Sequence, residues 1–187
     1  MKIAFIGTHG VGKTTLCFDL AARMKRLDLS VDLVKEVARQ CPLPINRDTT
    51  LDAQSWILHR QIAEEIEAVS RFEAVICDRS VIDNYAYLVH RVGPRAELEP
   101  MIRHWIQSYD GLFKVPVVQA PSFDGTRDIS ASFQHEIDEL LDQLLERLRV
   151  RAHPLDPSDR AQWIDHVLKI LGLPTKAPQY QLFDPGP

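Results

Sequence analysis

"GTHGVGKTT", from Gly7 to Thr15, is the stretch that decides the fold of this chain of 187 residues. Its first eight residues match the pattern G-x-x-x-x-G-K-[ST] without a mismatch. The apolar run Ile3 to Ile6 precedes it, and apolar residues follow at helical spacing from Lys13. Glycines in such a turn let backbone N–H groups surround phosphate oxygens, and the dipole of the next helix adds to the attraction. The stretch therefore predicts a phosphate-binding loop (P-loop) between a strand and a helix.

The residues of this loop have separate expected roles. Lys13 is expected to reach the β- and γ-phosphates of ATP, and the hydroxyl of Thr14 is expected to bind Mg²⁺. His9 occupies a variable position of the pattern, so the sequence assigns it no chemistry of its own. The predicted nucleotide-binding residues are Gly7, Thr8, His9, Gly10, Val11, Gly12, Lys13, Thr14 and Thr15.

Length and composition predict a single globular domain. A chain of this length buries about two thirds of its unfolded surface, and 45% hydrophobic residues support a core. The apolar run at the N-terminus is too short for a signal peptide, and no stretch approaches the ~20 apolar residues of a membrane helix. Three cysteines without a CxxC pair fit a reducing compartment. We therefore expect a cytoplasmic protein without a membrane partner.

The net charge of −4 disfavours a protein that coats nucleic acid. Basic residues still gather in two places, around Arg91, Arg95 and Arg103 and in "RLRVR" at residues 147–151. Their simplest interpretation is a solvated face or arginines that bind phosphate groups. The charge therefore favours a small-molecule partner over a polynucleotide, and it leaves monomer and homodimer open.

Strands and helices are predicted to alternate along the chain. Strands are expected at Ile3–Ile6, Val31–Glu36, Ala74–Asp78, Leu112–Gln119 and Arg149–Ala152. Helices are expected after Lys13, around a buried stripe of Ile62, Ile66 and Val69, and at residues 81–91, 94–108, 133–148 and 156–172. Asp156 is the expected N-cap of the last helix, and Gly172 its end. This alternation predicts an α/β fold with a largely parallel sheet and ligands at the carboxyl ends of its strands.

The end of the predicted strand Ala74–Asp78 distinguishes between classes of nucleotide-binding protein. A carboxylate at this edge, that of Asp78, fits a second contact to Mg²⁺; the alternative is that it caps the next helix. A mechanical ATPase of the large hexameric class usually has Glu after this Asp to polarise water, whereas this chain has Arg79. A guanidinium is a poor base but binds an anionic substrate or a transferring phosphoryl group well. The pair favours phosphoryl transfer over mechanical ATP hydrolysis.

The segment "CDRSVIDNYAYL", residues 77–88, resembles the D-R-x-x-x-S-x-x-A-Y-Q signature of thymidylate kinases and the E-R-S segment of deoxynucleoside kinases. Asp83 replaces the Ser of that signature and Leu88 replaces the Gln. In addition, "KEVARQCP" lacks the P-G-G-T that follows the corresponding Glu in thymidylate kinases. These differences disfavour thymidylate itself as the acceptor.

The order of elements is more similar to the kinase-domain group that includes the ribosylnicotinamide kinase half of the bifunctional NAD-biosynthesis regulator. That group has a P-loop, an E-x-A-R segment after the second strand and D-R-S at the third. The resemblance implies a P-loop NTPase three-layer sandwich with a five-stranded, largely parallel sheet. It also implies a kinase domain over residues 1–172 with a helical lid region at about 120–132, followed by a proline-rich tail at 173–187.

The resemblance assigns roles to three further charged residues. Glu36 would accept the proton of the acceptor hydroxyl or hold that hydroxyl in line, with Arg39 beside it; the alternative is that the two pair on the surface. Arg127 would close over the phosphates and exclude water; the alternative is an exposed loop arginine. The predicted catalytic residues are Lys13, Glu36, Asp78, Arg79 and Arg127.

Aromatic residues are candidates for the acceptor site. The candidates are Trp56, His59, Tyr85 and Tyr87, of which Trp56 and Tyr85 are suited to stack on a planar ring. The alternative is that aromatic residues at helical spacing belong to the core. The predicted substrate-binding residues are Glu36, Arg39, Trp56, Arg79 and Tyr85.

These features predict a kinase that uses ATP and Mg²⁺ to phosphorylate a hydroxyl or phosphate of a nucleoside, nucleotide or related small molecule. One alternative is a nucleotide-binding switch or sensor, although the chain lacks the D-x-x-G and N-K-x-D patterns of guanine switches. Another is a kinase for a hydroxymethylated base or another hydroxyl in a polynucleotide, which the acidic net charge opposes. The sequence leaves open the acceptor and the choice between ATP and GTP.

Overall fold

The computed structural model describes residues 1–45, 49–118 and 130–176. Within these ranges, five parallel strands form one sheet in the order β2-β3-β1-β4-β5. The strands are β1 (Lys2–Ile6), β2 (Val31–Val34), β3 (Ala74–Asp78), β4 (Gly111–Lys114) and β5 (His153–Pro154). The helices are α1 (Lys13–Lys25), η1 (Val37–Gln40), α2 (Leu51–Val69), α3 (Val81–Val92), α4 (Glu99–Ile106), α5 (Ala131–Leu148), η3 (Arg160–Gln162) and α6 (Trp163–Ile170). The predicted α/β fold with a five-stranded sheet is confirmed.

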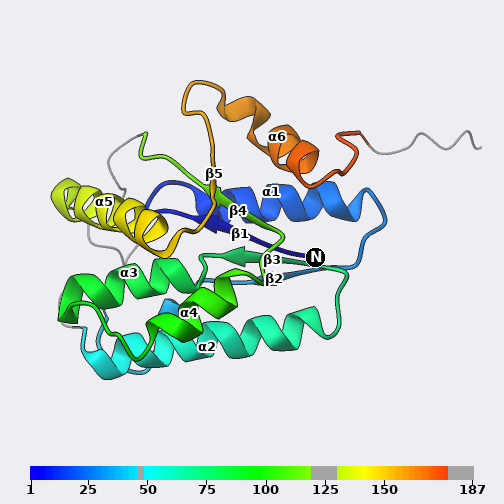
Figure 1. Ribbon diagram of the computed structural model, residues 1–187. Helices are drawn as coiled ribbons and strands as arrows, with labels where there is room; N and C mark the ends of the chain where they lie inside the picture. Colours follow the sequence, from blue (N-terminus) through cyan, green and yellow to red (C-terminus); the bar gives the residue numbers. More distant parts are fainter. Residues whose placement is uncertain (46–48, 119–129, 177–187) are drawn as a thin grey trace, which may run out of the picture.

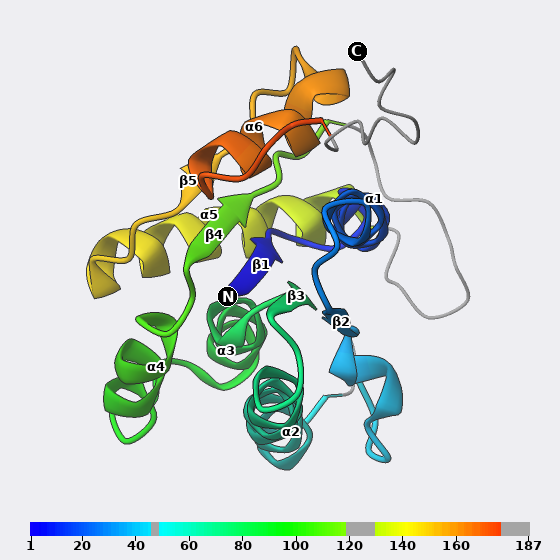
Figure 2. The ribbon, with the colours of Figure 1, turned by 90° about the vertical axis from the view of Figure 1, so that its right-hand side faces the viewer.

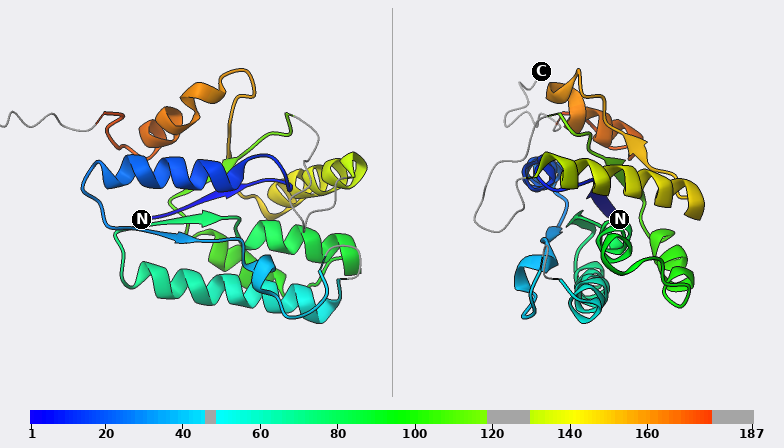
Figure 3. Two further views of the ribbon diagram at one scale, coloured as in Figure 1. Left: turned by 180° about the vertical axis from the view of Figure 1, so that it is seen from behind. Right: turned by 90° about the vertical axis from the view of Figure 1, so that its left-hand side faces the viewer.

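Helices cover both faces of the sheet and complete a three-layer sandwich. Figure 1 shows α1 and α6 on one face and α2, α3 and α4 on the other, and Figures 2 and 3 show the same layers from other sides. Residues of α5 share a buried core with α2, α3 and α4, whereas α1 and α6 enclose a second core. Strands β1 and β3 are buried along their whole length, which is why both read as continuous apolar runs.

The parallel pairing brings three loops together at one edge of the sheet. Phe5 of β1 pairs with Asp78 of β3, and Val34 of β2 pairs with Cys77, so the carboxyl ends of the three strands lie side by side. The P-loop follows β1, Glu36 follows β2, and Asp78 ends β3. Sheet register therefore places these three segments next to one another.

The last strand and the last helix lie later in the chain than the sequence predicted. The fifth strand is not Arg149–Ala152, because Arg149 adopts a left-handed conformation, with φ of 55°, where α5 ends, and the chain pairs with β4 only at His153–Pro154. Asp156 is not the N-cap of α6. Its carboxylate accepts hydrogen bonds within a turn from the N–H and hydroxyl of Ser158, at 2.8 and 2.6 Å.

The buried face of α2 also differs from the prediction. Ile66 and Val69 are 57% and 47% exposed, so they do not belong to a buried stripe. The buried face instead carries Gln54, Gln61 and Glu65. Apolar spacing failed here because these polar side chains find hydrogen-bond partners inside the protein, which removes most of the cost of burying them.

The structure describes residues 173–176 of the predicted tail. Leu173 packs against the core between α1 and α6, and its N–H donates to the carbonyl of Leu168 at 2.8 Å. Residues 177–187 lie outside the described residues, as does the predicted lid region except for residues 130–132, with which α5 begins. Over residues 1–45, 49–118 and 130–176, we find no helix with the length and apolarity needed to cross a membrane.

Candidate active site

The P-loop between β1 and α1 depends on glycine at two positions. Gly7 has φ of 140°, and a Cβ atom there would lie 2.8 Å from the carbonyl oxygen of Val115. Gly12, the N-cap of α1, has φ of 95°. Residues with a side chain rarely adopt such backbone angles, so both positions favour glycine. The loop can therefore turn sharply and present its backbone N–H groups at the start of α1.

Lys13 is buried beneath the backbone of the P-loop. Its ammonium group donates to the carbonyl oxygens of Gly7 and Thr8 at 2.8 and 2.5 Å. Burial and the positive charge of Arg79 lower the pKa of Lys13 to about 8, although nearby carboxylates oppose this shift. A partly desolvated ammonium at this place is a strong partner for phosphate oxygens.

This pKa predicts proton uptake when ATP binds in alkaline solution. At about pH 9 most of the free protein carries neutral Lys13, and phosphate favours the protonated form, so binding should take up a proton. At about pH 6.5 the lysine is already charged and contributes no uptake. Titration calorimetry in two buffers of different ionisation enthalpy measures the difference. Equal uptake by a Lys13→Met variant would assign the proton to another group.

Thr14 and Asp78 place two oxygen atoms together at the mouth of the loop. The hydroxyl of Thr14 donates to the carboxylate of Asp78 at 2.5 Å, and Asp78 is buried. Hydroxyl and carboxylate oxygens are ligands that Mg²⁺ accepts, so the pair fits the expected ion. The alternative role of Asp78 as a cap is not observed, because Ser80 is the N-cap of α3. Thr15 lies exposed on the first turn of α1.

A buried carboxylate, that of Asp83, joins the P-loop to α3. One of its oxygens accepts the backbone N–H of Gly7 at 2.8 Å. The other accepts the N–H and the hydroxyl of Ser80 at 2.8 and 2.9 Å, which completes a capping box. Burial raises the pKa of Asp83, against the effects of Lys13 and Arg79. The sequence analysis noted Asp83 only as a departure from a signature and missed this contact.

Replacing Asp83 by alanine should loosen both segments. The change removes the Asp83 half of the capping box and leaves the N–H of Gly7 unpaired, so we expect the free energy of unfolding to fall by about 2 kcal/mol. This corresponds to a melting temperature lower by about 4–8 °C, and we also expect weaker ATP binding. Differential scanning calorimetry checks it, with Asp52→Ala on the exposed first turn of α2 as the control. A loss no greater than that of the control would contradict the role of Asp83.

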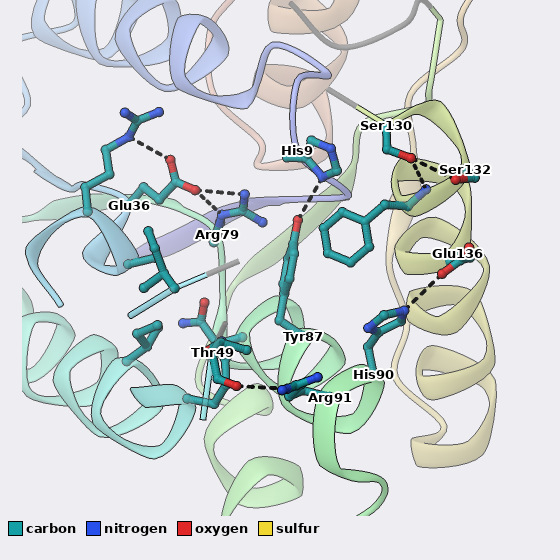
Figure 4. A pocket seen from close by; sticks show the side chains of 17 residues that line it. His9, Glu36, Thr49, Arg79, Tyr87, His90, Arg91, Ser130, Ser132 and Glu136 are labelled. Carbon is teal, nitrogen blue, oxygen red and sulfur yellow. Dashed lines mark hydrogen bonds and ion pairs between the residues drawn. The ribbon is translucent and has the colours of Figure 1, made fainter. Parts of the chain in front are cut away.

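Glu36 and Arg79 form an inward-facing ion pair at the carboxyl ends of β2 and β3. Both Nη2 and Nε of Arg79 lie close to Oε1 of Glu36, at 2.8 and 2.9 Å, while Nε of Arg39 lies 3.0 Å from Oε2 (Figure 4). Burial alone would raise the pKa of Glu36, but Arg79, Lys13 and Arg39 together lower it to about 2. Glu36 does pair with Arg39, as the alternative interpretation of the sequence proposed. It also pairs with Arg79 inside the site, so the pair with Arg39 is only part of its environment.

Arg79 has an unusual backbone and a buried guanidinium. Its φ is 92°, a region that costs a residue other than glycine about 1–3 kcal/mol. The guanidinium carbon lies 5.0 Å from the centre of the Tyr87 ring. Its Nη1 atom is buried and has no hydrogen-bond partner among the described residues. One donor of Arg79 thus remains available for an anionic ligand.

A cavity of about 400 Å³ opens beside this ion pair. Aromatic rings form one wall, where Phe133 of α5 lies 5.4 Å from the ring of His9, 5.2 Å from His90 and 6.1 Å from Tyr87. Figure 4 shows Arg79 and Glu36 opposite this wall. Further lining residues are Ala38, Arg39, Ile45, Thr49, Gln54, Ile57, Asn84, Arg91, Ser130, Ser132 and Glu136. The cavity combines an apolar aromatic side with a charged side, which is typical of a small-molecule site.

The structure separates the predicted acceptor residues. Glu36, Arg39 and Arg79 line the cavity, whereas Tyr85 lies in the core with its hydroxyl bonded to Glu99 at 3.0 Å. Trp56 does not line the cavity, because it lies on another side of α2 from Gln54 and Ile57. Exposed His59 is bonded to the carbonyl of Ser55 within its own helix. Arg127 lies outside the described residues.

Several residues of the cavity were missed by sequence reasoning. They come from α2 and the residue before its N-cap, from α3 and from α5, and they include Thr49, Gln54, Asn84, His90, Phe133 and Glu136. One signal was available: Gln54 stands among apolar residues on the inner face of a helix, where an amide needs a specific reason. The contribution of α5 could not be read in the same way, since only tertiary packing brings Phe133 beside the P-loop.

A family model described as an AAA domain matches residues 2–162, most of the chain. The chain belongs to this AAA domain family. No match was found among curated proteins. The P-loop of this AAA domain and its five-stranded parallel sheet agree with the match.

Solved structures place this AAA domain among P-loop kinase folds. It is similar to the NadR protein solved in complex with NR, with a TM-score of 0.74 and 23% identity over 96% of this chain and 54% of that one. The thymidylate kinase from Ehrlichia chaffeensis matches with a TM-score of 0.65 and 20% identity, over 91% of this chain and 98% of that one. The deoxyadenosine kinase from M. mycoides matches with a TM-score of 0.64 and 16% identity, over 92% of this chain and 99% of that one. The chain thus spans about half of the NadR chain, and the likeness confirms the predicted P-loop kinase-like fold.

Proposed function

We propose that this protein is a kinase that uses ATP and Mg²⁺ to phosphorylate a nucleoside- or nucleotide-like small molecule. One observation carries the proposal: a cavity large enough for such a molecule adjoins the P-loop and is lined by Glu36 and Arg79. A protein that only hydrolyses a nucleotide has no need of a second site there. The proposed kinase domain covers residues 1–172.

In this proposal each charged residue acts at a different atom. Lys13 and the N–H groups of the P-loop bind the phosphates of ATP, and Mg²⁺, held by Thr14 and Asp78, neutralises charge on the phosphates when it is bound. Arg79 donates to the oxygens of the γ-phosphoryl group as charge develops on them. Glu36 accepts a hydrogen bond from the acceptor hydroxyl and aligns its oxygen with phosphorus.

The ion pairs that lower the pKa of Glu36 bear on when it accepts the proton in this proposal. A carboxylate with a pKa of about 2 is too weak a base to deprotonate an alcohol before reaction. The new oxygen–phosphorus bond therefore forms while the bond to the bridging oxygen of ADP breaks, and the hydroxyl becomes acidic as this happens. Glu36 can then accept the proton late in the transfer, which fits the small demand for base catalysis in phosphoryl transfer.

A small acceptor fits the site better than a polynucleotide. The volume of about 400 Å³ lies in the range of small-molecule sites. Arg91 and Arg103 line different cavities, and Arg91 donates to the carbonyl of Thr49, so they do not form one basic groove. The names of the three solved relatives, two of them kinases of a nucleoside or nucleotide, support an acceptor of this class.

The test is transfer from γ-labelled ATP to pooled nucleosides, nucleotides, cofactor precursors and hydroxymethyl-containing DNA. We expect label in one small-molecule pool, and dividing that pool then identifies the acceptor. Label in DNA would favour the polynucleotide kinase instead. Nucleotide binding without transfer to any pool would favour the switch or sensor, and repeating the assay with γ-labelled GTP tests the donor.

A further inference from the structure

We infer that Gln61 and Glu65 of α2 are positioning residues that hold Arg79 in its active conformation without touching a substrate. This inference rests on the proposed function of Arg79 in phosphoryl transfer. Neither residue lines the acceptor cavity, and both are fully buried.

Glu65 is the centre of a buried polar cluster. Its carboxylate accepts hydrogen bonds from Gln61 at 2.8 Å, Trp105 at 2.7 Å and Tyr109 at 2.6 Å. The ammonium of Lys2 lies 2.7 Å from the same carboxylate and 4.4 and 4.3 Å from the centres of the Trp105 and Tyr109 rings. Every partner comes from a different segment: β1, α2, α4 and the chain before β4.

Such a cluster is not a strong means of stabilising a fold. Burying a carboxylate and an ammonium costs solvation that their attraction often only offsets, and an apolar set of similar volume frequently serves stability as well. Buried polar groups that are paired do fix one geometry, because a shift leaves a group unsatisfied; the four groups around Glu65 are paired with its carboxylate, while Oε1 of Gln61 has no hydrogen-bond partner among the described residues. The arrangement therefore indicates that the cluster fixes the position of the backbone that it contacts.

Two of those contacts fall on the turn that carries Arg79. Nε2 of Gln61, which donates to Glu65, also lies 3.3 Å from the carbonyl oxygen of Arg79. The hydroxyl of Tyr109 lies 3.4 Å from the backbone N–H of Val81, two residues further on. The cluster thus contacts the backbone on both sides of Ser80.

Arg79 needs such support because its own backbone is strained. A positive φ in a residue other than glycine persists only where the surroundings hold it. Relaxation of that φ would redirect the side chain away from Glu36, with which it now pairs at 2.8 Å. Gln61 holds the carbonyl of this residue, and Glu65 holds Gln61. The rigid cluster around Glu65 therefore holds the strained backbone of Arg79 in place through Gln61.

The first test observes Arg79 directly and needs no acceptor. The variant Gln61→Met keeps the volume of the side chain but removes its donor, while Glu65 keeps three partners. In wild-type protein we expect the Nε–H signal of Arg79 in NMR spectra to be protected from exchange with water, since this group is buried against Glu36; its absence in Arg79→Lys assigns it. We expect Gln61→Met to lose the protection. Ala68→Gly, which weakens the same helix but removes no hydrogen bond of the cluster, should keep it.

The second test is a double-mutant cycle on the transfer reaction. In otherwise wild-type protein, Gln61→Met should lower kcat about 10-fold and leave KM for ATP nearly unchanged. In the Arg79→Lys background, the same change should lower kcat by less than about twofold. A purely structural role would give additive losses instead. A protected Arg79 signal in Gln61→Met, or additive losses in the cycle, would overturn the inference. If wild-type protein phosphorylates no acceptor, the proposed function fails, while the NMR result still decides whether Gln61 positions Arg79.

Discussion

Replacing Lys13 by alanine lowers phosphoryl transfer by about 1,000-fold or more, the largest effect that we expect of a single substitution. Removing one charged donor to a transferring group commonly costs a rate factor of this size. Lys13 is suited to that role because it is buried, lies against the carbonyl oxygens of Gly7 and Thr8, and has a pKa lowered to about 8. Bringing a phosphate to such a group replaces contacts with backbone carbonyls by contacts with full negative charges.

The measurement is initial velocity with the identified acceptor, together with ATP affinity from calorimetry. Lys25→Ala is the matched control, because it removes the same kind of side chain from the last turn of the same helix. We expect the control to keep both velocity and affinity within about twofold. A Lys13→Ala variant with nearly normal velocity would contradict the role of the P-loop in transfer and with it the proposed function.

Replacing Arg79 by alanine should lower kcat by about 100-fold while ATP still binds. In the proposed function the guanidinium is one of the cationic groups that stabilise the transferring group, and its Nη1 atom has no hydrogen-bond partner among the described residues. ATP affinity depends mainly on the P-loop, so it should change little. Glu36→Gln should cost only about 10-fold, since a carboxylate with a pKa of about 2 aligns the hydroxyl more than it takes the proton.

These two substitutions also test each other. Because Arg79 and Glu36 form one ion pair, the double variant Glu36→Gln/Arg79→Ala should cost less than the product of the two single losses. Arg71→Ala, which breaks an exposed pair with Glu67 on α2, is the control and should leave kcat unchanged. Normal turnover of Glu36→Gln and Arg79→Ala on a true acceptor would show that the residues of the site have been assigned wrongly.

The fold could be predicted because its signals are local. A strand, a glycine-rich turn and a helix within the first 25 residues specify the P-loop, and β3 was predicted with its observed bounds. The errors also have local causes. A left-handed residue at Arg149 and a turn around Asp156 shifted the last strand and helix, and neither leaves a clear mark in apolar spacing.

The candidate site could be predicted only where it depends on sheet order. Lys13, Glu36, Asp78 and Arg79 follow or end strands, so a parallel sheet brings them to one edge. Side chains on helices are different. The ring of Tyr85 points into the core while Tyr87, two residues on, faces the cavity, because successive helix positions are about 100° apart. Which of these directions is inward depends on neighbouring helices.

The amino-acid sequence by itself determined that this protein has a P-loop, a parallel sheet and a carboxylate–arginine pair at the end of its third strand. Those features arise from bonding between near neighbours in the chain and from strand periodicity. Only the tertiary structure decided that Asp83 joins the P-loop to α3, that Phe133 lines the cavity and that Glu65 supports Arg79 through Gln61. The contacts of Asp83 with Gly7, of Phe133 with His9 and of Gln61 with Arg79 join residues 76, 124 and 18 positions apart, and packing rather than local conformational preference selects them.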